Sequence, residues 1–379
     1  MNVPKLRFKE FNDEWSFIEL SKISSDISYG MGLASKEYDG VNKYIRITDI
    51  DETTNKYSNK DIVSPDGLLE DKYLVNKNDI LFARTGASTG KTYLYNEKDG
   101  KLYFAGFLIR ANIVNHDANF IFQQTKTNKY NKWVKIMSMR SGQPGINSQE
   151  YGSYKFSITS PEEEEKISKT LNLLDKKIEL QTKKIEDLKL FKKGLITEAK
   201  KDKSDWNEFY IKDIFKITRG VVIPKTELTD TKTNENIYPV YSSQTTNNGI
   251  LGYDKKYDFD GKYLTWTTDG ANAGSVFYRN GKFRCTNVCG VLYNENNNYV
   301  NEMVAELLNS ETPKYVSYVG NPKLMNNVMG DIKIELPSIN IQNKIATILK
   351  KMNKRIDLEE NKLIKLQELK KGLMQNMFI

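Results

Sequence analysis

Two segments of the chain carry apolar residues at alternating spacings of three and four. The positions are Leu171, Leu174, Ile178, Ile185 and Leu188 in the first segment, and Leu349, Met352, Ile356, Leu363 and Leu366 in the second. This is the a/d pattern of a coiled coil over about three heptads, and it predicts two long helices that each need an apolar partner. A helix of roughly 30–40 residues is about 45–60 Å long.

These two segments are copies of one another. Residues 166–196 and 344–374 align without a gap at an offset of 178, and each follows its own segment rich in Gly and aromatic residues. We therefore expect a tandem of two half-molecules, each a globular head followed by a long helix. Antiparallel pairing of the two helices would give each one its partner and close the chain with approximate two-fold symmetry.

Polar residues interrupt both patterns at matching places. Gln181 and Glu359 stand where an apolar residue is expected. Either they fix the register of the coiled coil at a cost in stability, or they lie at a splayed, wet part of the seam. Gly194 and Gly372, in the repeated Lys-Lys-Gly-Leu, cost about 1 kcal/mol each inside a helix. We expect them to mark a helix end or a close backbone contact.

The heads have short strand-like runs separated by Gly, Asn and Asp. In the first head the runs are 43–50, 79–86, 92–96 and 102–114, followed by a helical patch at 119–139 and a strand near 154–158. Residues 205–220, 261–274 and 319–336 repeat 14–30, 78–90 and 140–158 in the same order. The fold class is α+β, with a first head at 1–160, a long helix at 161–202, a second head at 203–336 and a long helix at 337–379.

Composition narrows the function only slightly. Lys and Arg number 57 against 49 Asp and Glu, a net charge of +8, which suits a polyanionic partner or reflects a preference for Lys. One histidine and two cysteines, Cys285 and Cys289, exclude a four-ligand zinc site. The few cysteines, and the absence of a signal core or a run of about 18 apolar residues, predict a cytoplasmic protein that does not span a membrane.

Motifs for catalysis are close to absent. GASTGKT at 86–92 resembles a phosphate-binding loop, but three residues separate Gly86 and Gly90 where four are needed, and the copy GANAGSV lacks the lysine. We interpret both as a tight turn repeated in the two heads. Asp66 and Glu70 lie too close together for a nuclease site, and the single His116 lies in an expected turn. The pattern favours a protein that binds without a reaction or metal of its own.

The heads do contain side chains suited to nucleic acid. Arg favours guanine, Asn and Gln favour adenine, and Lys favours phosphate. Any one of these residues is more often an ordinary surface residue, so the argument rests on the group as a whole. The candidates are Arg46, Arg84, Ser88, Lys91, Arg140 and Gln143 in the first head, and Arg219, Lys225, Tyr241, Gln244, Asn272, Arg279, Arg284 and Asn287 in the second.

The whole chain resembles the specificity (S) subunit of a type I restriction–modification system. The resemblance rests on the opening PKLRF with its later EW, the strand KYIRITDI, the two Gly-Ala-x-x-Gly turns and the SGQPGIN segment. It rests further on YPVYSSQTTNNGILGYDKKYDFDGKYLTW and KFRCTNVCGVL in the second head, and on the paired helices ending KKGL.

The resemblance implies two target recognition domains, each reading one half of a split DNA target, with the helices setting the gap between the halves. It implies no catalysis and no cofactor on this chain. The implied partners are double-stranded DNA, two methyltransferase (M) subunits that use S-adenosylmethionine, and restriction (R) subunits that use ATP and Mg. GNPKLMN at 320–326 departs from SGQPGIN at 141–147, which weakens transfer of a role to that loop. The alternative is a coiled-coil scaffold with two protein- or glycan-binding heads.

Overall fold

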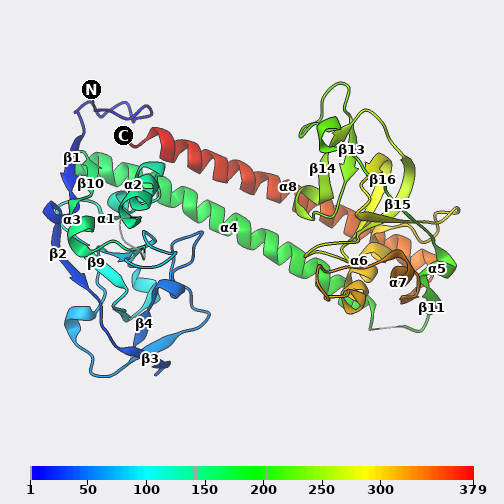
Figure 1. Ribbon diagram of the computed structural model, residues 1–379, viewed down its shortest axis with the longest axis horizontal. Coiled ribbons are helices and arrows are strands. Elements are labelled where there is room, and N and C mark those ends of the chain that lie inside the picture. Colours follow the sequence, from blue (N-terminus) through cyan, green and yellow to red (C-terminus); the bar gives the residue numbers. More distant parts are fainter. Residues whose placement is uncertain (1, 140–143, 202) are drawn as a thin grey trace. The chain divides into compact units, whose positions relative to one another are not determined.

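The computed structural model describes residues 2–139, 144–201 and 203–379 and divides into two compact units (Figure 1). Unit 1 comprises Met1–Gln181 together with Lys362–Ile379, and unit 2 comprises Thr182–Asn361. The division falls inside both long helices, so each unit contains a head and one half of each helix.

The long helices are α4, Pro161–Ala199, and α8, Ile339–Asn376. In unit 2, Lys184 Nζ lies 2.9 Å from Glu359 Oε1, and Lys192 Nζ lies 3.0 Å from Asn353 Oδ1. Residue numbers rise along one helix as they fall along the other, so the pairing is antiparallel, as predicted. In unit 1, Lys370 of α8 forms an ion pair with Asp175 of α4.

Burial follows the heptad pattern rather than hydrophobicity alone. All ten predicted seam residues are buried or half-buried, whereas Leu173, Leu180 and Leu190, which lie off the pattern, are 57–69% exposed. The burial of α4 and α8 therefore follows the predicted seam. Glu359 is fully buried within it and accepts from Lys184 and, at 2.8 Å, from Arg355. Because Glu359 is buried, it does not lie in a splayed, solvated part of the seam, and that interpretation is wrong for this residue.

The expectation for the two glycines was wrong. Gly194 and Gly372 lie inside α4 and α8, which continue to Ala199 and Asn376, and a Cβ at either glycine would meet no atom within 4 Å. Ile196, just beyond the first glycine, is buried in the core of unit 2. Packing of the residues that follow each glycine thus keeps the chain helical at the glycine itself.

The head of unit 1 is built on a four-stranded sheet in the order β2-β9-β6-β7. Three two-stranded pairs surround it: β1 with β10 and β3 with β5, both antiparallel, and β4 with β8, which is parallel. The strands are β1 Ser16–Glu19, β2 Ser24–Tyr29, β3 Ala34–Glu37, β4 Lys43–Ile45, β5 Val63–Asp66, β6 Asp79–Ala83, β7 Thr92–Leu94, β8 Leu102–Phe104, β9 Leu108–Ile113 and β10 Lys155–Ile158.

Three short helices complete this head: α1 Ala118–Gln124, α2 Asn128–Ser138 and α3 Ser148–Ser153. The predicted helical patch at 119–139 is therefore two helices. Thr127 separates them because its hydroxyl caps α2 by accepting from the N–H of Tyr130. The predicted run 102–114 is likewise two strands, β8 and β9, divided by a turn at 105–107.

Unit 2 has a six-stranded sheet in the order β12-β17-β15-β16-β13-β14, with β11 and β18 paired apart from it. The strands are β11 Asn207–Tyr210, β12 Lys216–Arg219, β13 Tyr238–Tyr241, β14 Ile250–Asp254, β15 Phe259–Thr267, β16 Val276–Cys285, β17 Cys289–Tyr293 and β18 Lys333–Leu336. The helices are α5 Ile211–Ile214, α6 Glu302–Glu311 and α7 Asn326–Gly330.

The two heads share one frame, as the repeated sequence order predicts. The order β2-β9-β6 matches β12-β17-β15, and the pair β1·β10 matches β11·β18. Each head packs on the long helices. The core of unit 1 joins Trp15, Phe120 and Leu171 to Phe378, and that of unit 2 joins Trp266 and Leu292 to Ile196 and Leu349.

Candidate nucleic-acid interface

In unit 1, four segments meet at the end of the four-stranded sheet. The Gly86–Gly90 turn between β6 and β7 donates from Gly86 N–H to Pro144 O at 3.0 Å, and Arg84 N–H donates to Phe107 O in the β8–β9 turn. A Cβ at Gly30, just after β2, would collide with the backbone of Ala105. Only glycine permits this close approach. We call these segments (30–32, 84–90, 105–107 and 144–147) the loop cluster of unit 1.

Unit 2 builds the same cluster with the same backbone bonds. Gly270 N–H donates to Pro322 O at 2.9 Å, Thr268 N–H donates to Val288 O, and a Cβ at Gly220 would collide with the backbone of Cys285. The loop cluster of unit 2 is thus formed by 220–222, 268–274, 286–288 and 322–325. Residues 144–147 of unit 1 and 322–325 of unit 2, which differ in sequence after the shared proline, occupy matching places in the two clusters.

The glycine-rich segments are tight turns in both heads, as predicted. Gly86 and Gly90 have φ values of 74° and 91°, and Gly270 and Gly274 have 94° and 87°. Because these left-handed conformations favour glycine, they explain why glycine recurs in both turns. Nucleotide binding is not needed to explain it. The side chains carried by the two turns differ, with Ser88 in one and Asn272 in the other.

Three predicted residues of unit 1 lie on or beside its cluster. The guanidinium of Arg84 lies over the ring of Tyr29, with its Cζ 4.7 Å from the centroid. Ser88 lies in the glycine turn, and Lys91 follows it with its Nζ 3.1 Å from Ile50 O and 3.3 Å from Glu52. Arg140 and Gln143 lie outside the described residues.

Arg46 follows Ile45, whose carbonyl accepts from the N–H of Ala105 in the cluster, but the guanidinium of Arg46 is already engaged. The guanidinium makes two hydrogen bonds to Asp49, of 2.8 and 2.9 Å. Arg46 is also the N-cap residue of the turn that begins at Ile47. The neighbouring carboxylate of Asp49 is 6% exposed, so this pair has a structural role in the free protein.

In unit 2 the structure brings together Tyr241, Gln244 and Arg279. Arg279 is 3% exposed, lies 3.6 Å from the centroid of Tyr241, and donates to Thr265 at 3.1 Å. No carboxylate among the described residues forms an ion pair with it, and burial lowers its pKa. Gln244 donates to Ile250 O in the loop over this pair. Here Arg279 is held by aromatic faces rather than presented to solvent.

The other predicted residues of unit 2 lie in three different places. Arg284 is ion-paired with Asp254 and Asp258 at 2.6 and 2.9 Å. Arg219, Asn272 and Asn287 lie at or beside the loop cluster, and Asn272 and Asn287 are exposed. Lys225 is exposed on a separate loop.

Cys285 and Cys289, near the loop cluster of unit 2, are free and buried. The hydrogen bond between them, together with burial, raises the pKa of Cys285.

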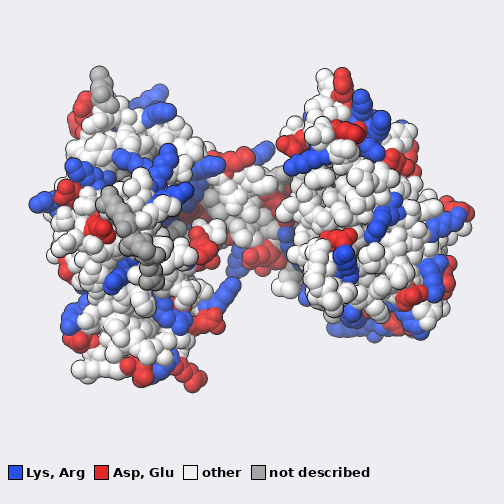
Figure 2. Space-filling model, in the orientation of Figure 1, with Lys and Arg blue, Asp and Glu red and all other residues white. Residues whose placement is uncertain are grey.

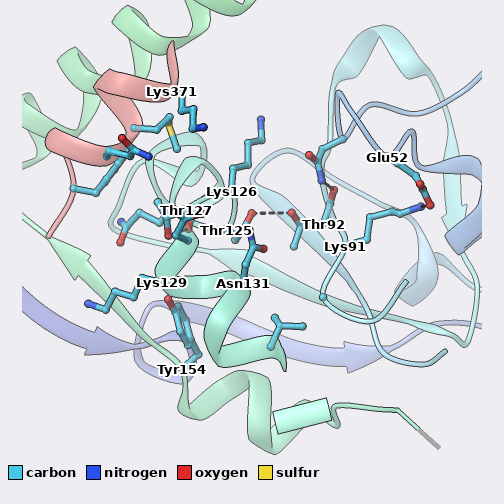
Figure 3. A pocket seen from close by; sticks show the side chains of 18 of the residues that line it. Glu52, Lys91, Thr92, Thr125, Lys126, Thr127, Lys129, Asn131, Tyr154 and Lys371 are labelled. Carbon is cyan, nitrogen blue, oxygen red and sulfur yellow. Dashed lines mark hydrogen bonds and ion pairs between the residues drawn. The ribbon is translucent and has the colours of Figure 1, made fainter. Parts of the chain in front are cut away.

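Sequence reasoning missed several residues at these surfaces. Phe107 is 64% exposed in the β8–β9 turn, and Val222 is 75% exposed at the matching end of unit 2. Apolar residues inside strand-like runs are usually assigned to the core, and only the adjacent glycines signalled a turn. Reasoning also missed a groove in unit 1 that includes Lys126 and Lys371 (Figure 3).

No group of His, Cys, Asp and Glu among the described residues could hold a metal ion. Within the same residues, none of the helices has the length and apolar character needed to cross a bilayer.

Residues 12–190 and 203–368 each match the family model described as the type I restriction modification DNA specificity domain. A putative type I specificity subunit N-terminus from Mycoplasma pneumoniae is 49% identical over 142 residues, which cover 37% of this chain and 74% of that protein. The specificity subunit of the type I restriction enzyme MpnII, from the same organism, is 46% identical over 142 residues, or 37% of this chain and 42% of its own length.

Among solved structures, the S subunit of a type I restriction–modification system from M. genitalium matches with a TM-score of 0.72. The match covers 100% of this chain and 99% of that one at 16% sequence identity. At this identity the likeness concerns the fold.

Proposed function

Because the chain belongs to the type I restriction–modification DNA specificity family and contains two such domains in tandem, we propose that it reads a bipartite, asymmetric DNA target. Each loop cluster would read one half. The observation that carries this proposal is that both clusters have one backbone frame and different side chains. Arg84 in unit 1 corresponds to Thr268 in unit 2, Gly106 corresponds to Asn287, and Phe107 corresponds to Val288.

Affinity and specificity would come from different contacts. Lysines and backbone N–H groups would bind phosphates and make binding depend on salt, whereas a few Arg, Asn or Gln contacts to base edges would select sequence. Each good bidentate contact is worth roughly 1–3 kcal/mol of discrimination. Arg84, Ser88, Arg219, Asn272 and Asn287 are favoured for this role by their position in or beside the clusters.

The proposal also includes partners. The chain would supply recognition without catalysis and direct two M subunits, which methylate adenine with S-adenosylmethionine, and R subunits, which use ATP and Mg. The helices α4 and α8 would set the gap between the two half-sites. Such a complex would act in the cytoplasm, where the DNA is.

The test is co-expression of the full chain with its methyltransferase subunit, followed by mapping of methylated adenines across the host genome at single-base resolution. We expect one motif with two unlike halves and a constant gap. A well-formed complex that methylates no bipartite motif would contradict the proposal and favour a scaffold role.

A further inference from the structure

A groove of about 860 Å³ opens on unit 1 where three segments meet (Figure 3). One wall is the glycine turn of the loop cluster, continuing to Lys91. A second is the link between α1 and α2, residues 125–128. The third is the end of α8, with Lys370 and Lys371. The groove is therefore continuous with the candidate interface, since Ser88 belongs to both.

Positive charge dominates this groove. Lys126 lies 4.1 Å from the centroid of Phe122, and no carboxylate among the described residues forms an ion pair with it. Burial, and then the neighbouring Lys370, lower its pKa to about 8. Asp175 opposes this shift, but its carboxylate is already paired with Lys370, so the half-buried ammonium of Lys126 has no carboxylate of its own. Figure 2 shows Lys and Arg gathered over this part of unit 1.

The remaining charges leave this imbalance in place. Asp175 accepts from Lys370, and Glu52, which is 82% exposed at the rim, pairs with Lys91. Lys371 forms no ion pair with a described residue. The 11-residue helix α2 begins in the wall after Thr127, so the positive end of its dipole adds to the lysines.

The repeat provides an internal comparison. At the offset of 178, Lys192 and Lys193 of α4 correspond to Lys370 and Lys371 of α8. In unit 2, Lys192 is neutralised by Glu306 of α6 at 2.7 Å. The matching helix of unit 1, α1, carries no acidic residue. Lys370 is paired instead with Asp175 of α4, whose counterpart in unit 2 is Asn353, so in unit 1 the neutralising carboxylate comes from a long helix and not from the head.

We propose that this groove binds a phosphate group, supplied by the backbone of the DNA next to the half-site that unit 1 reads. The inference rests on the proposed function. Ammonium groups, the Thr and Ser hydroxyls and a helix N-terminus are the donors that phosphate oxygens accept from. The open groove and its continuity with the loop cluster favour a DNA backbone over a free phosphate or an acidic peptide.

The test compares two variants of the full chain in binding a labelled DNA duplex at several salt concentrations. The double variant Lys126→Met with Lys371→Ala removes both lysines that lack an ion pair. The double variant Lys132→Met with Lys193→Ala is the matched control, since Lys132 is exposed on α2 and Lys193 is the repeat counterpart of Lys371. We expect the groove variant to bind roughly 5–10-fold more weakly near 0.1 M salt, with a salt slope lower by about 0.9.

The outcomes distinguish a failure of the proposed function from a failure of the phosphate-binding groove alone. If neither the unaltered chain nor its complex with the M subunit binds DNA, the proposed function fails; where only the complex binds, both variants are compared within it. If it binds DNA and the groove variant keeps the same affinity and salt slope, only this inference fails. Inorganic phosphate or a polyglutamate peptide that stabilises the unaltered chain more than the groove variant, with DNA binding unchanged, overturns the assignment to DNA. Melting temperatures confirm that each variant is folded.

Discussion

Glu163 and Glu164 occur in the run Pro161–Glu165 and look like solvated charges at a helix start, yet both are fully buried. Glu163 accepts two hydrogen bonds of 2.7 Å from Arg7 and one of 3.1 Å from Trp15. Glu164 lies 2.9 Å from His116 Nδ1. Within unit 1, Glu163 ties the first residues of the chain to the start of α4, and Glu164 ties the turn before α1 to it.

The ion pair of Glu163 predicts acid sensitivity. Burial opposes ionisation, but the hydrogen bonds from Arg7, Thr159 and Trp15 prevail and hold the pKa of Glu163 below its ordinary value of 4.5. Because the folded-state pKa is lowered, the stabilisation is complete above about pH 4.5 and is lost as the pH falls through the folded-state value.

The variant Arg7→Met tests this. It leaves a buried carboxylate with only neutral donors, and we expect unfolding at pH 7 to cost roughly 2–3 kcal/mol less than in the unaltered chain. The difference, measured by denaturant unfolding, should shrink as the pH approaches 3. A difference that does not change with pH would show that Arg7 acts through packing alone.

Removing the buried carboxylate of Glu359 should have the opposite effect on stability. Its partners Lys184 and Arg355 are 44% and 56% exposed and can be hydrated without it. We therefore expect Glu359→Leu to leave the melting temperature unchanged or raise it, because an apolar residue in a seam often replaces a buried ion pair without loss. Lys184→Met should lower it. If Glu359→Leu also alters the register of the pair, cross-linking between cysteines placed on α4 and α8 would detect it.

At the scale of elements, the two helix glycines offer a direct test of packing. Gly194→Ala and Gly372→Ala add a methyl group that meets no atom within 4 Å, so each should stabilise the chain by about 0.5–1 kcal/mol. Gly90→Ala should destabilise it, since its φ is 91° and the new Cβ would collide with Val134. Thermal melts of the three variants give the comparison, and a destabilising Gly194→Ala would reveal a contact not present in this structure.

The sequence predicted elements where one periodicity persists and failed where short elements interact. The heptads located α4 and α8 and their pairing, and the repeated motifs located the strands that frame each head. Periodicity could not divide 102–114 into β8 and β9, because a turn at 105–107 carries apolar residues. It also could not show that Arg279 and Arg284 are engaged, since aromatic and acidic partners come from other strands.

At the scale of the whole molecule, the proposed function predicts that helix length sets the DNA gap. Inserting one heptad after Gln181 and a matching heptad after Asn361 keeps the antiparallel seam in phase and lengthens each helix by about 10.5 Å, or roughly three base pairs. We expect the mapped motif to keep both half-sites and gain about three base pairs between them. Changed half-site bases with an unchanged gap would contradict this role of the helices.

Met377 and Phe378, which follow α8, lie in the core of unit 1 beside Trp15 and Phe120. The ribosome makes these residues after all of unit 2, so the unit that is made first cannot complete its core until the second one has been translated. A nascent chain halted before residue 377 would thus have a finished unit 2 and an unfinished unit 1. A nonsense mutation shortly before codon 377 would damage unit 1, most of which is encoded upstream of unit 2.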